Sequence, residues 1–151
     1  KDAGISVMAL PATDMHLGGR KDAENVRRTI TPVRALRDGG VNVCLATNNI
    51  RNAITPYGTG DLLQIAALAL PACHLGGADD QATVLDMLTV NPAKALRLPD
   101  YGLTVGARAD MVLLDTRRAA DVILDIPDRN VVVKGGRIVA RTTRRVETAL
   151  G

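Results

Sequence analysis

The sequence has 151 residues, of which 46% are hydrophobic and 23% charged, so it can bury one domain-sized core and is not typical of a disordered protein. Phe and Trp are absent, and Tyr57 and Tyr101 are the only aromatic residues of that kind, which leaves little surface for stacking nucleic-acid bases. The formal charge of +3 is scattered, and the one basic cluster, residues 141–145, lies at the end of the chain. Nucleic acid is therefore not an expected partner.

Cysteine usage and hydropathy narrow the class further. Cys44 and Cys73 lie in apolar surroundings without a metal-binding spacing, which predicts two reduced core thiols and a cytoplasmic location. The longest apolar run, residues 62–73, contains Gln64 and Pro71 and is too short to cross a bilayer, so no membrane partner is expected. Because the sequence starts with lysine rather than methionine, we expect it to be part of a longer protein.

The start of the chain predicts a strand, a loop and a helix. Residues 5–10 form a short apolar run that ends at Pro11, and residues 13–20 form a polar, glycine-bearing loop. Apolar residues recur at three- or four-residue spacing over residues 25–38, which is typical of an amphipathic helix that the next two glycines would close. Pro32 is expected to kink or restart this helix.

Residues 41–49 are the stretch around which the chain is organised. Strand-forming residues follow two glycines and stop at the polar cluster Thr47, Asn48 and Asn49. This pattern predicts a strand buried on both faces of a parallel sheet. Because ligands bind where the strands of parallel α/β folds end, we expect the chemistry at this cluster.

Helices are predicted next. Residues 50–59 indicate a loop, Asp61 is placed to cap a helix over residues 62–72, and a second helix is expected over residues 81–90. An Asn-Pro pair predicts a third short helix over residues 91–98. The order strand, helix, strand, helix gives two βα units followed by a helical tail.

Beyond residue 100 the pattern changes to short β-rich runs. These are residues 111–114, 131–133 and 138–140, with a Lys-Gly-Gly-Arg turn at residues 134–137 that predicts a hairpin. We therefore expect a boundary near residue 100 and part of a small β-subdomain after it.

Six segments occur in the order in which one known family carries them: HLGGR (16–20), GVNVCLATNN (40–49), TPYGTGDLLQ (55–64), LTVNPAKALRL (88–98), DYGLTVGARADMVLLD (100–115) and VVKGGRIVA (132–140). On these segments the chain resembles the C-terminal part of the amidohydrolase superfamily, most closely cytosine deaminase.

The resemblance implies an α/β fold, the C-terminal portion of a (β/α)8 TIM-like barrel followed by part of a small β-sandwich. Residues 1–99 would supply the last two βα units of a metal-dependent hydrolase barrel, with residues 5–10 and 41–46 as its strands seven and eight. Residues 100–151 would supply part of the composite sandwich subdomain. A complete barrel of this kind takes roughly 250 residues, so this chain would supply only its end.

The implied activity is hydrolytic deamination, the cleavage of a C–N bond in a cyclic, pyrimidine-like compound by an enzyme that holds a divalent metal, iron or zinc. In this family strand eight ends in an aspartate that meets the metal and shuttles protons, and the aligned residue here is Asn48. An amide takes up no proton from water near neutral pH. The remaining metal ligands would lie upstream, so we expect the isolated chain to be inactive and to bind no metal alone.

The resemblance assigns substrate contacts to Asn49, Ile54 and Tyr57, with Ile54 in place of a large aromatic residue over the substrate ring. Asn49 would offer both a donor and an acceptor to a pyrimidine edge. From the residues alone, Asn49 and Asn52 are equally well explained as turn residues.

Other polar residues are predicted to be structural. His16 and His74 have no partner at metal-ligand spacing, so both are expected to be surface histidines, with His16 nearer the site. Asp110 and Asp115 flank an apolar run and would fit either a catalytic pair or two turn formers, of which we favour turn formers.

The expected partners are the missing N-terminal barrel portion, a small-molecule substrate and further copies of the chain, because two barrel strands without their neighbours have exposed edges. The alternative hypothesis is a non-catalytic remnant or pseudoenzyme that associates through those edges. A polyanion-binding role for residues 141–145 is the weakest alternative.

Overall fold

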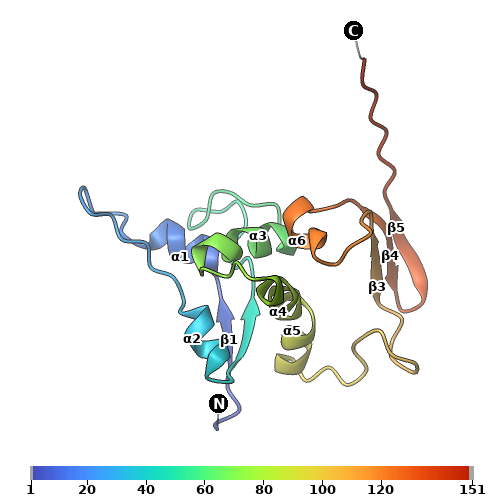
Figure 1. Cartoon of the computed structure of the whole chain (residues 1–151), viewed down its shortest axis with the longest axis horizontal. Helices are drawn as coiled ribbons and strands as arrows, with labels where there is room; N and C mark the ends of the chain where they lie inside the picture. Colours follow the sequence, from blue (N-terminus) through green and yellow to red (C-terminus); the bar gives the residue numbers. More distant parts are fainter. Residues whose placement is uncertain (1, 150–151) are drawn as a thin grey trace. The chain divides into compact units, whose positions relative to one another are not determined.

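The structure, a computed structural model, describes residues 2–149, which fall into two compact units that divide between Leu98 and Pro99. The first unit contains β1 (Ser6–Ala9), α1 (Pro11–Leu17), α2 (Val33–Asp38), β2 (Asn42–Leu45), α3 (Leu62–Ala72), α4 (Ala78–Leu88) and α5 (Val90–Ala95), and the second contains β3 (Met111–Leu114), α6 (Asp121–Asp125), β4 (Arg129–Lys134) and β5 (Arg137–Arg141) (Figure 1).

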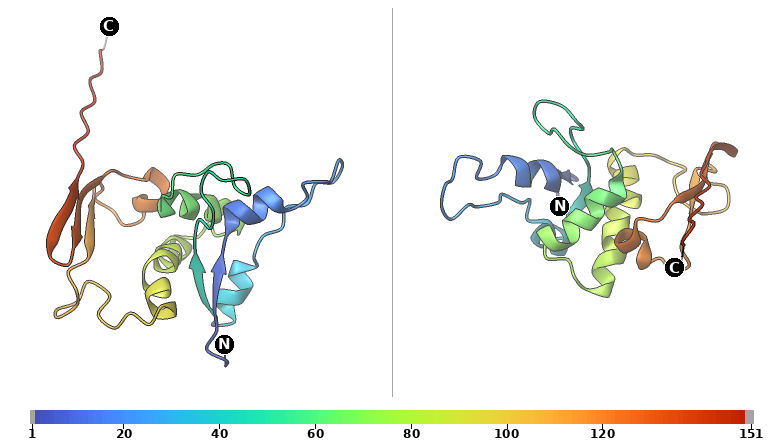
Figure 2. Two further views of the ribbon diagram at one scale, coloured as in Figure 1. Left: turned by 180° about the vertical axis from the view of Figure 1, so that it is seen from behind. Right: turned by 90° about the horizontal axis from the view of Figure 1, so that it is seen from above.

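The centre of the first unit is the parallel pair β1–β2, in register from Ser6 opposite Asn42 to Ala9 opposite Leu45. The last three residues of β2 are almost fully buried. Helices α2, α4 and α5 all pack against β2 (Figures 1 and 2). The sequence-based prediction of a parallel strand buried on both faces is therefore confirmed.

Two asparagines tie α5 to the strands. The Asn42 amide donates to Ser6 Oγ at 2.9 Å and to the Asn91 carbonyl at 3.0 Å. The Asn91 amide in turn donates to the Val43 carbonyl at 2.7 Å. A strand carbonyl with no third strand beside it in the described structure is thus satisfied by a side chain. Asn91 of the Asn-Pro pair therefore also anchors α5 to β2.

Helix α3 has the predicted bounds and the predicted cap. The Asp61 carboxylate accepts a hydrogen bond from the Leu63 N–H at 2.9 Å, as an N-cap does. Helix α4 begins three residues earlier than expected, at Ala78, because Asp80 caps it by accepting from the Gly77 N–H at 2.9 Å.

The prediction of a loop over residues 13–20 is wrong, because α1 already begins at Pro11. A proline in the first helical turn has φ preset for the helix and needs no donor there. The polar residues that suggested a loop have partners instead. The Asp14 carboxylate accepts from the Thr31 backbone N–H at 3.2 Å and from its hydroxyl at 2.9 Å.

The predicted helix over residues 25–38 is shortened to α2, Val33–Asp38. Pro32 is its N-cap, so the proline starts the helix instead of kinking it. The earlier apolar residue Val26 is 45% exposed and contributes to no buried helix face. Gly40, with φ of +75°, closes the helix in the left-handed conformation that glycine favours.

The second unit is built on an antiparallel sheet in the order β3-β4-β5. The Lys-Gly-Gly-Arg turn forms the predicted hairpin between β4 and β5. The Asp110 carboxylate accepts from the Gly135 N–H at 2.6 Å and from Lys134 Nζ at 2.5 Å, and these bonds, Lys134 first, hold the pKa of that carboxyl below its usual range. Asp110 thus supports a turn, as expected. The short helix α6 is absent from the sequence-based prediction.

Both cysteines are free thiols in the core, as predicted. Burial raises the pKa of the Cys44 thiol, and burial together with the nearby Asp14 carboxylate raises the pKa of the Cys73 thiol.

Within the described residues, none of the helices combines the length and the apolar character needed to cross a bilayer.

An ion cluster joins α2 to the start of α4. The Asp80 carboxylate, in a residue only 8% exposed, accepts from Arg37 Nη1 at 2.6 Å and lies 3.4 Å from Arg34 Nη2. Arg34 also donates to the His74 carbonyl. The Gly77 N–H, and then Arg37, hold the pKa of Asp80 below its usual range, and the Asp80 bond raises the pKa of Arg37.

We predict that Asp80→Asn lowers the melting temperature at pH 7. Because the folded-state pKa of Asp80 lies below the unfolded value of about 3.9, the carboxylate stabilises the fold above that value and stops doing so as the pH falls through the folded-state pKa. The difference in melting temperature between the two proteins should therefore shrink below about pH 4. Thermal unfolding followed by circular dichroism from pH 7 to pH 3 measures it. The control Asp79→Asn makes the same charge change at an exposed neighbour, and equal losses in both variants would contradict the prediction.

Candidate functional site

The candidate site lies at the carboxyl ends of β1 and β2. Because the strands are parallel, both ends face the same side, and the pairing extends one residue further through the Ala46 N–H, which donates to the Ala9 carbonyl at 3.1 Å. The polar cluster Thr47, Asn48 and Asn49 follows immediately. Figure 1 shows that the chain after β2 forms a loop before it enters α3. The structure therefore places the predicted polar cluster where a parallel fold would place a ligand.

Asn48 turns the chain out of the strand. Its φ is +60°, in the left-handed region that asparagine tolerates better than most residues. Its side chain is exposed and makes no hydrogen bond to another residue in the described part of the chain. Asn48 is thus available to a partner or a ligand.

The loop after Asn49 is ordered by its own hydrogen bonds. The Asn52 carbonyl oxygen Oδ1 accepts from the Ile54 and Thr55 backbone N–H groups at 3.0 and 2.9 Å. The Asn52 backbone N–H donates to the Thr55 carbonyl at 3.0 Å, and the Asn52 amide donates to Asn49 Oδ1 at 2.9 Å. Asn52 therefore acts as a turn residue, one of the two readings that the sequence left open.

A small cleft of about 30 Å³ lies between this loop and α3. It is lined by hydroxyl, amide and carboxylate side chains together with a few apolar ones: Ala12, Thr47, Asn49, Ile50, Thr55, Tyr57, Thr59, Asp61, Gln64 and Ile65. Of the predicted substrate-binding residues, Asn49 and Tyr57 line this cleft. Ile54 does not line it and is 51% exposed.

His16 lies against Tyr57. The two ring centroids are 5.2 Å apart with perpendicular planes, an edge-to-face contact that holds the loop onto α1. Nearby, the buried hydroxyls of Thr13 and Thr55 are 3.5 Å apart. Sequence analysis placed His16 close to the site but missed these contacts, because they join residues about forty positions apart.

The described residues do not fit a divalent metal on their own. Within residues 2–149 no three His, Cys, Asp or Glu side chains come together, and Asn48 would supply a single neutral oxygen. His74 has its own explanation. It follows α3 at φ of +55°, and the Leu75 N–H reaches back to the Leu70 carbonyl at 2.8 Å, the geometry of a helix end that usually has glycine.

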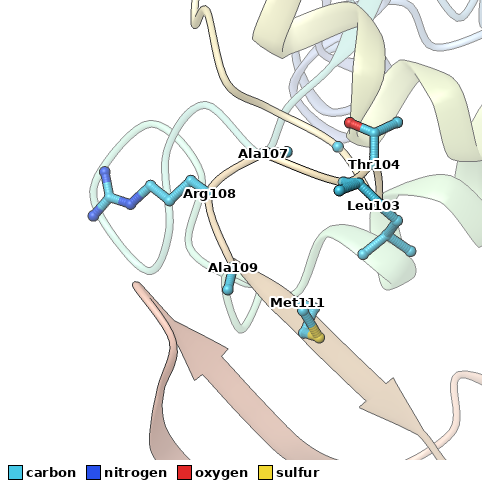
Figure 3. Close-up of a pocket in the computed structure, with 8 residues that line it drawn as sticks. Leu103, Thr104, Ala107, Arg108, Ala109 and Met111 are labelled. Atoms are coloured by element: carbon cyan, nitrogen blue, oxygen red, sulfur yellow. The ribbon is translucent and has the colours of Figure 1, made fainter.

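A larger hollow of about 400 Å³ lies in the second unit, formed by residues 102–111 (Figure 3). Its lining is mostly apolar, and Leu103 and Val105 are almost fully exposed. Arg108 extends away from Leu103 and Met111 in Figure 3 and lies 3.5 Å from the Asp110 carboxylate. The hollow contains none of the predicted site residues and brings no catalytic group together.

A parallel strand pair packed against helices is part of an α/β fold, and the carboxyl ends of its strands, where the polar cluster lies, are where such folds bind ligands. Residues 1–140 match the amidohydrolase family. The chain belongs to that family, as its sequence motifs indicated.

Two similar proteins support the cytosine deaminase-like resemblance. The chain is 32% identical to the pterin deaminase of Rhizobium rhizogenes, over 99% of this chain and 35% of that protein. It is 33% identical to a 5-methylcytosine deaminase from Klebsiella pneumoniae solved with 5-fluorocytosine, which superposes with a TM-score of 0.89 over 99% of this chain and 36% of that chain. The chain thus spans about a third of the length of these relatives.

A more distant structure shares the fold and contains a metal. It is an adenosine deaminase from Xanthomonas campestris with bound zinc, 20% identical, with a TM-score of 0.70 over 91% of this chain and 32% of that chain. Zinc is therefore bound in a protein of this fold, while the described residues of the present chain bring no metal site together.

We predict that His74→Gly stabilises the chain by about 1 kcal/mol, because glycine has no Cβ to strain in the left-handed conformation. Urea unfolding of the variant and the wild type measures the change. His74→Ala is the matched control. It keeps the strained Cβ, so it should give no such gain. A loss of stability in the glycine variant would show that the imidazole itself is needed.

Proposed function

We propose that this chain is the C-terminal part of a metal-dependent hydrolase that cleaves C–N bonds in a cyclic, pyrimidine-like nitrogenous compound. The observation that carries the proposal is the position of Asn48 and Asn49 at the carboxyl end of the parallel strand pair. Membership of the amidohydrolase family and the similarity to two deaminases support it. The chain's thiols are unpaired, in keeping with a cytoplasmic location.

In this proposal the first unit supplies the last two βα units of a barrel, with β1 and β2 as its strands seven and eight. The second unit supplies part of a β-sandwich. Both assignments are supported by strand edges that lack a neighbouring strand and by a sheet that is not covered. β1 and β2 have no third strand in the described structure, and every residue of β5 is exposed. The N-terminal portion of the protein is the partner that would complete both units.

The roles of the site residues follow from their chemistry. Asn49 and Tyr57 line the cleft and would contact the substrate, and Ile54, exposed on the same loop, would cover the ring. A divalent metal, iron or zinc, would be held chiefly by residues outside this chain, and it would supply Lewis acidity. Asn48 stands where the family has an acid, and because an amide accepts no proton near neutral pH, it cannot act as a general base.

The alternative is a non-catalytic protein that associates through its exposed edges. It is favoured by the amide at Asn48, which removes the proton acceptor that hydrolysis would use at this position. Both hypotheses predict that residues 1–151 alone release no ammonia, so only the full-length protein separates them.

We predict that the full-length protein contains a divalent metal, and that Asn48→Asp raises its turnover of cyclic C–N substrates by at least about a hundredfold, the lower end of what one positioned general base contributes. Metal analysis and an ammonia-release assay on pyrimidines, pterins and triazines measure both. Asn25→Asp, the same change in a distant exposed loop, is the control. A metal-free parent, or one in which Asn48→Asp has no effect on turnover, would contradict the proposal.

We also predict that the isolated chain self-associates, because the outer edges of the β1–β2 pair and the exposed faces of β3 and β5 need covering. Sedimentation velocity over a range of concentrations measures the mass. A concentration-independent monomer of 15.9 kDa would contradict the prediction. Adding the N-terminal portion should replace self-association by a one-to-one complex.

A further inference from the structure

The backbone of residues 47–50 makes no hydrogen bond to another residue in the described part of the chain. The β1–β2 ladder ends with the bond from the Ala46 N–H, and the next backbone bond along the chain runs from the Arg51 N–H to the Tyr57 carbonyl at 3.2 Å. Asn48 lies in this stretch, is exposed and left-handed, and has no partner for its side-chain amide among residues 2–149. A change of conformation or of chemistry at Asn48 therefore breaks no hydrogen bond.

Two groups that can react with each other adjoin at this position. The Asn49 backbone nitrogen, once deprotonated, is a nucleophile, and the Asn48 side-chain carbon Cγ lies close to it along the chain, so their reaction is intramolecular. Attack forms a bond between Asn49 N and Asn48 Cγ, and Asn48 Nδ2 leaves as ammonia. Water then opens the cyclic imide at Cγ, which restores the peptide bond and leaves an aspartate. One amide and one water thus give one carboxylic acid and one ammonia.

The other asparagines of the chain lack at least one of these conditions. Asn130 lies within strand β4. Asn25 is exposed and left-handed like Asn48, but the next residue is Val26, whose branched Cβ crowds the attacking nitrogen. The remaining four have a side-chain amide group that is hydrogen-bonded to another residue: Asn42, Asn49, Asn52 and Asn91. Asn48 combines an unbonded side chain with a following residue that is not branched at Cβ.

We propose that Asn48 is a self-deamidation site, at which the Asn49 backbone nitrogen converts the side-chain amide into an aspartate. Resting on the proposed function, this reaction supplies the acid that hydrolysis would use at the end of β2, so the protein is made inactive and gains activity as it ages. The turn accepts the product, because aspartate tolerates the left-handed region as asparagine does. The reaction needs no co-reactant other than water.

Peptide mass spectrometry of the full-length protein tests the modification. Fresh protein is incubated in water enriched in oxygen-18 and then digested in ordinary water, so that a heavy oxygen marks conversion in the folded state. Trypsin releases residues 38–51 as one peptide, in which Asn42 and Asn49 are internal controls. We expect the heavy oxygen at Asn48, and several times less at Asn25. The rate should rise from pH 6 to pH 9, because the attacking nitrogen must lose its proton.

Two substitutions of the following residue separate this chemistry from a loosened loop. Asn49→Gly uncovers the attacking nitrogen and should speed the conversion several times. Asn49→Val crowds the nitrogen with a branched Cβ and should slow it several times. Both variants lose the bond from Asn52 to Asn49 equally. A loop effect would change both rates in the same direction, and that result would overturn the inference.

Ammonia release by the same samples links the modification to activity. Conversion itself releases at most one ammonia per chain, so turnover is counted beyond that amount. We expect turnover of cyclic substrates to rise in step with the aspartate fraction, toward the level of Asn48→Asp and by at least about a hundredfold.

The outcomes separate this inference from the proposed function. An active protein in which Asn48 stays an amide would overturn the inference and leave the proposed function standing. So would an active protein in which the imide opens only at the backbone carbonyl, because the resulting isoaspartate carries the main chain through its side chain. Conversion to aspartate without turnover, in the aged protein and in Asn48→Asp alike, would overturn the proposed function and the activating role together.

Discussion

The parallel pairing of β1 with β2 is the constraint on which the first unit depends. Parallel strands need cover on both faces, and α2, α4 and α5 all pack against β2, whose last three residues are almost fully buried. Two strands leave many backbone groups without a ladder partner. The Asn91 amide bonds one of them, the Val43 carbonyl, and the Asn42 amide in turn bonds the Asn91 carbonyl. These side chains hold the register at the start of β2, and the register decides where β2 ends. The position of Asn48 is therefore fixed from the opposite end of the strand.

The site itself is held by contacts of a different kind. The loop after β2 has no regular structure, and its shape comes from the Asn52 turn and from the edge-to-face contact of His16 with Tyr57. Buried strands place the polar cluster, and exposed side-chain contacts shape the cleft. A rigid scaffold with an adaptable loop at the carboxyl end of its strands is how parallel folds change substrate without changing the core.

Local signals in the sequence were sufficient where residues adjacent in the chain decide the local structure. Asp61 gave the start of α3, the Lys-Gly-Gly-Arg turn gave the hairpin, and the run of strand formers before Thr47 gave β2. They failed where a tertiary contact decides. The polar start of α1 resembled a loop because the bonds from Thr31 to Asp14 cannot be seen in sequence.

The candidate site could likewise be predicted from the sequence only where local motifs mark it. Motifs could point to Asn48 and Asn49, since both follow a recognisable strand. The contact of His16 with Tyr57 joins distant parts of the chain, and the ion cluster at Asp80 is made with arginines on another helix. The spacing of residues along the sequence predicts neither of these two contacts. The orientation of the Asn49 amide is beyond sequence for the same reason, because it depends on which atoms of Asn52 meet the backbone.

The backbone conformation at Asn48 shows which properties of this side chain the turn requires and which it does not. A residue at φ of +60° must tolerate the left-handed region, and asparagine and aspartate are both among the residues that do so. The backbone therefore accounts for a short polar side chain at this position but not for an amide in place of an acid. The two side chains have nearly the same shape, so the difference between them is one of charge and proton affinity. The turn alone therefore does not select asparagine over aspartate at this position, because both side chains fit the left-handed conformation.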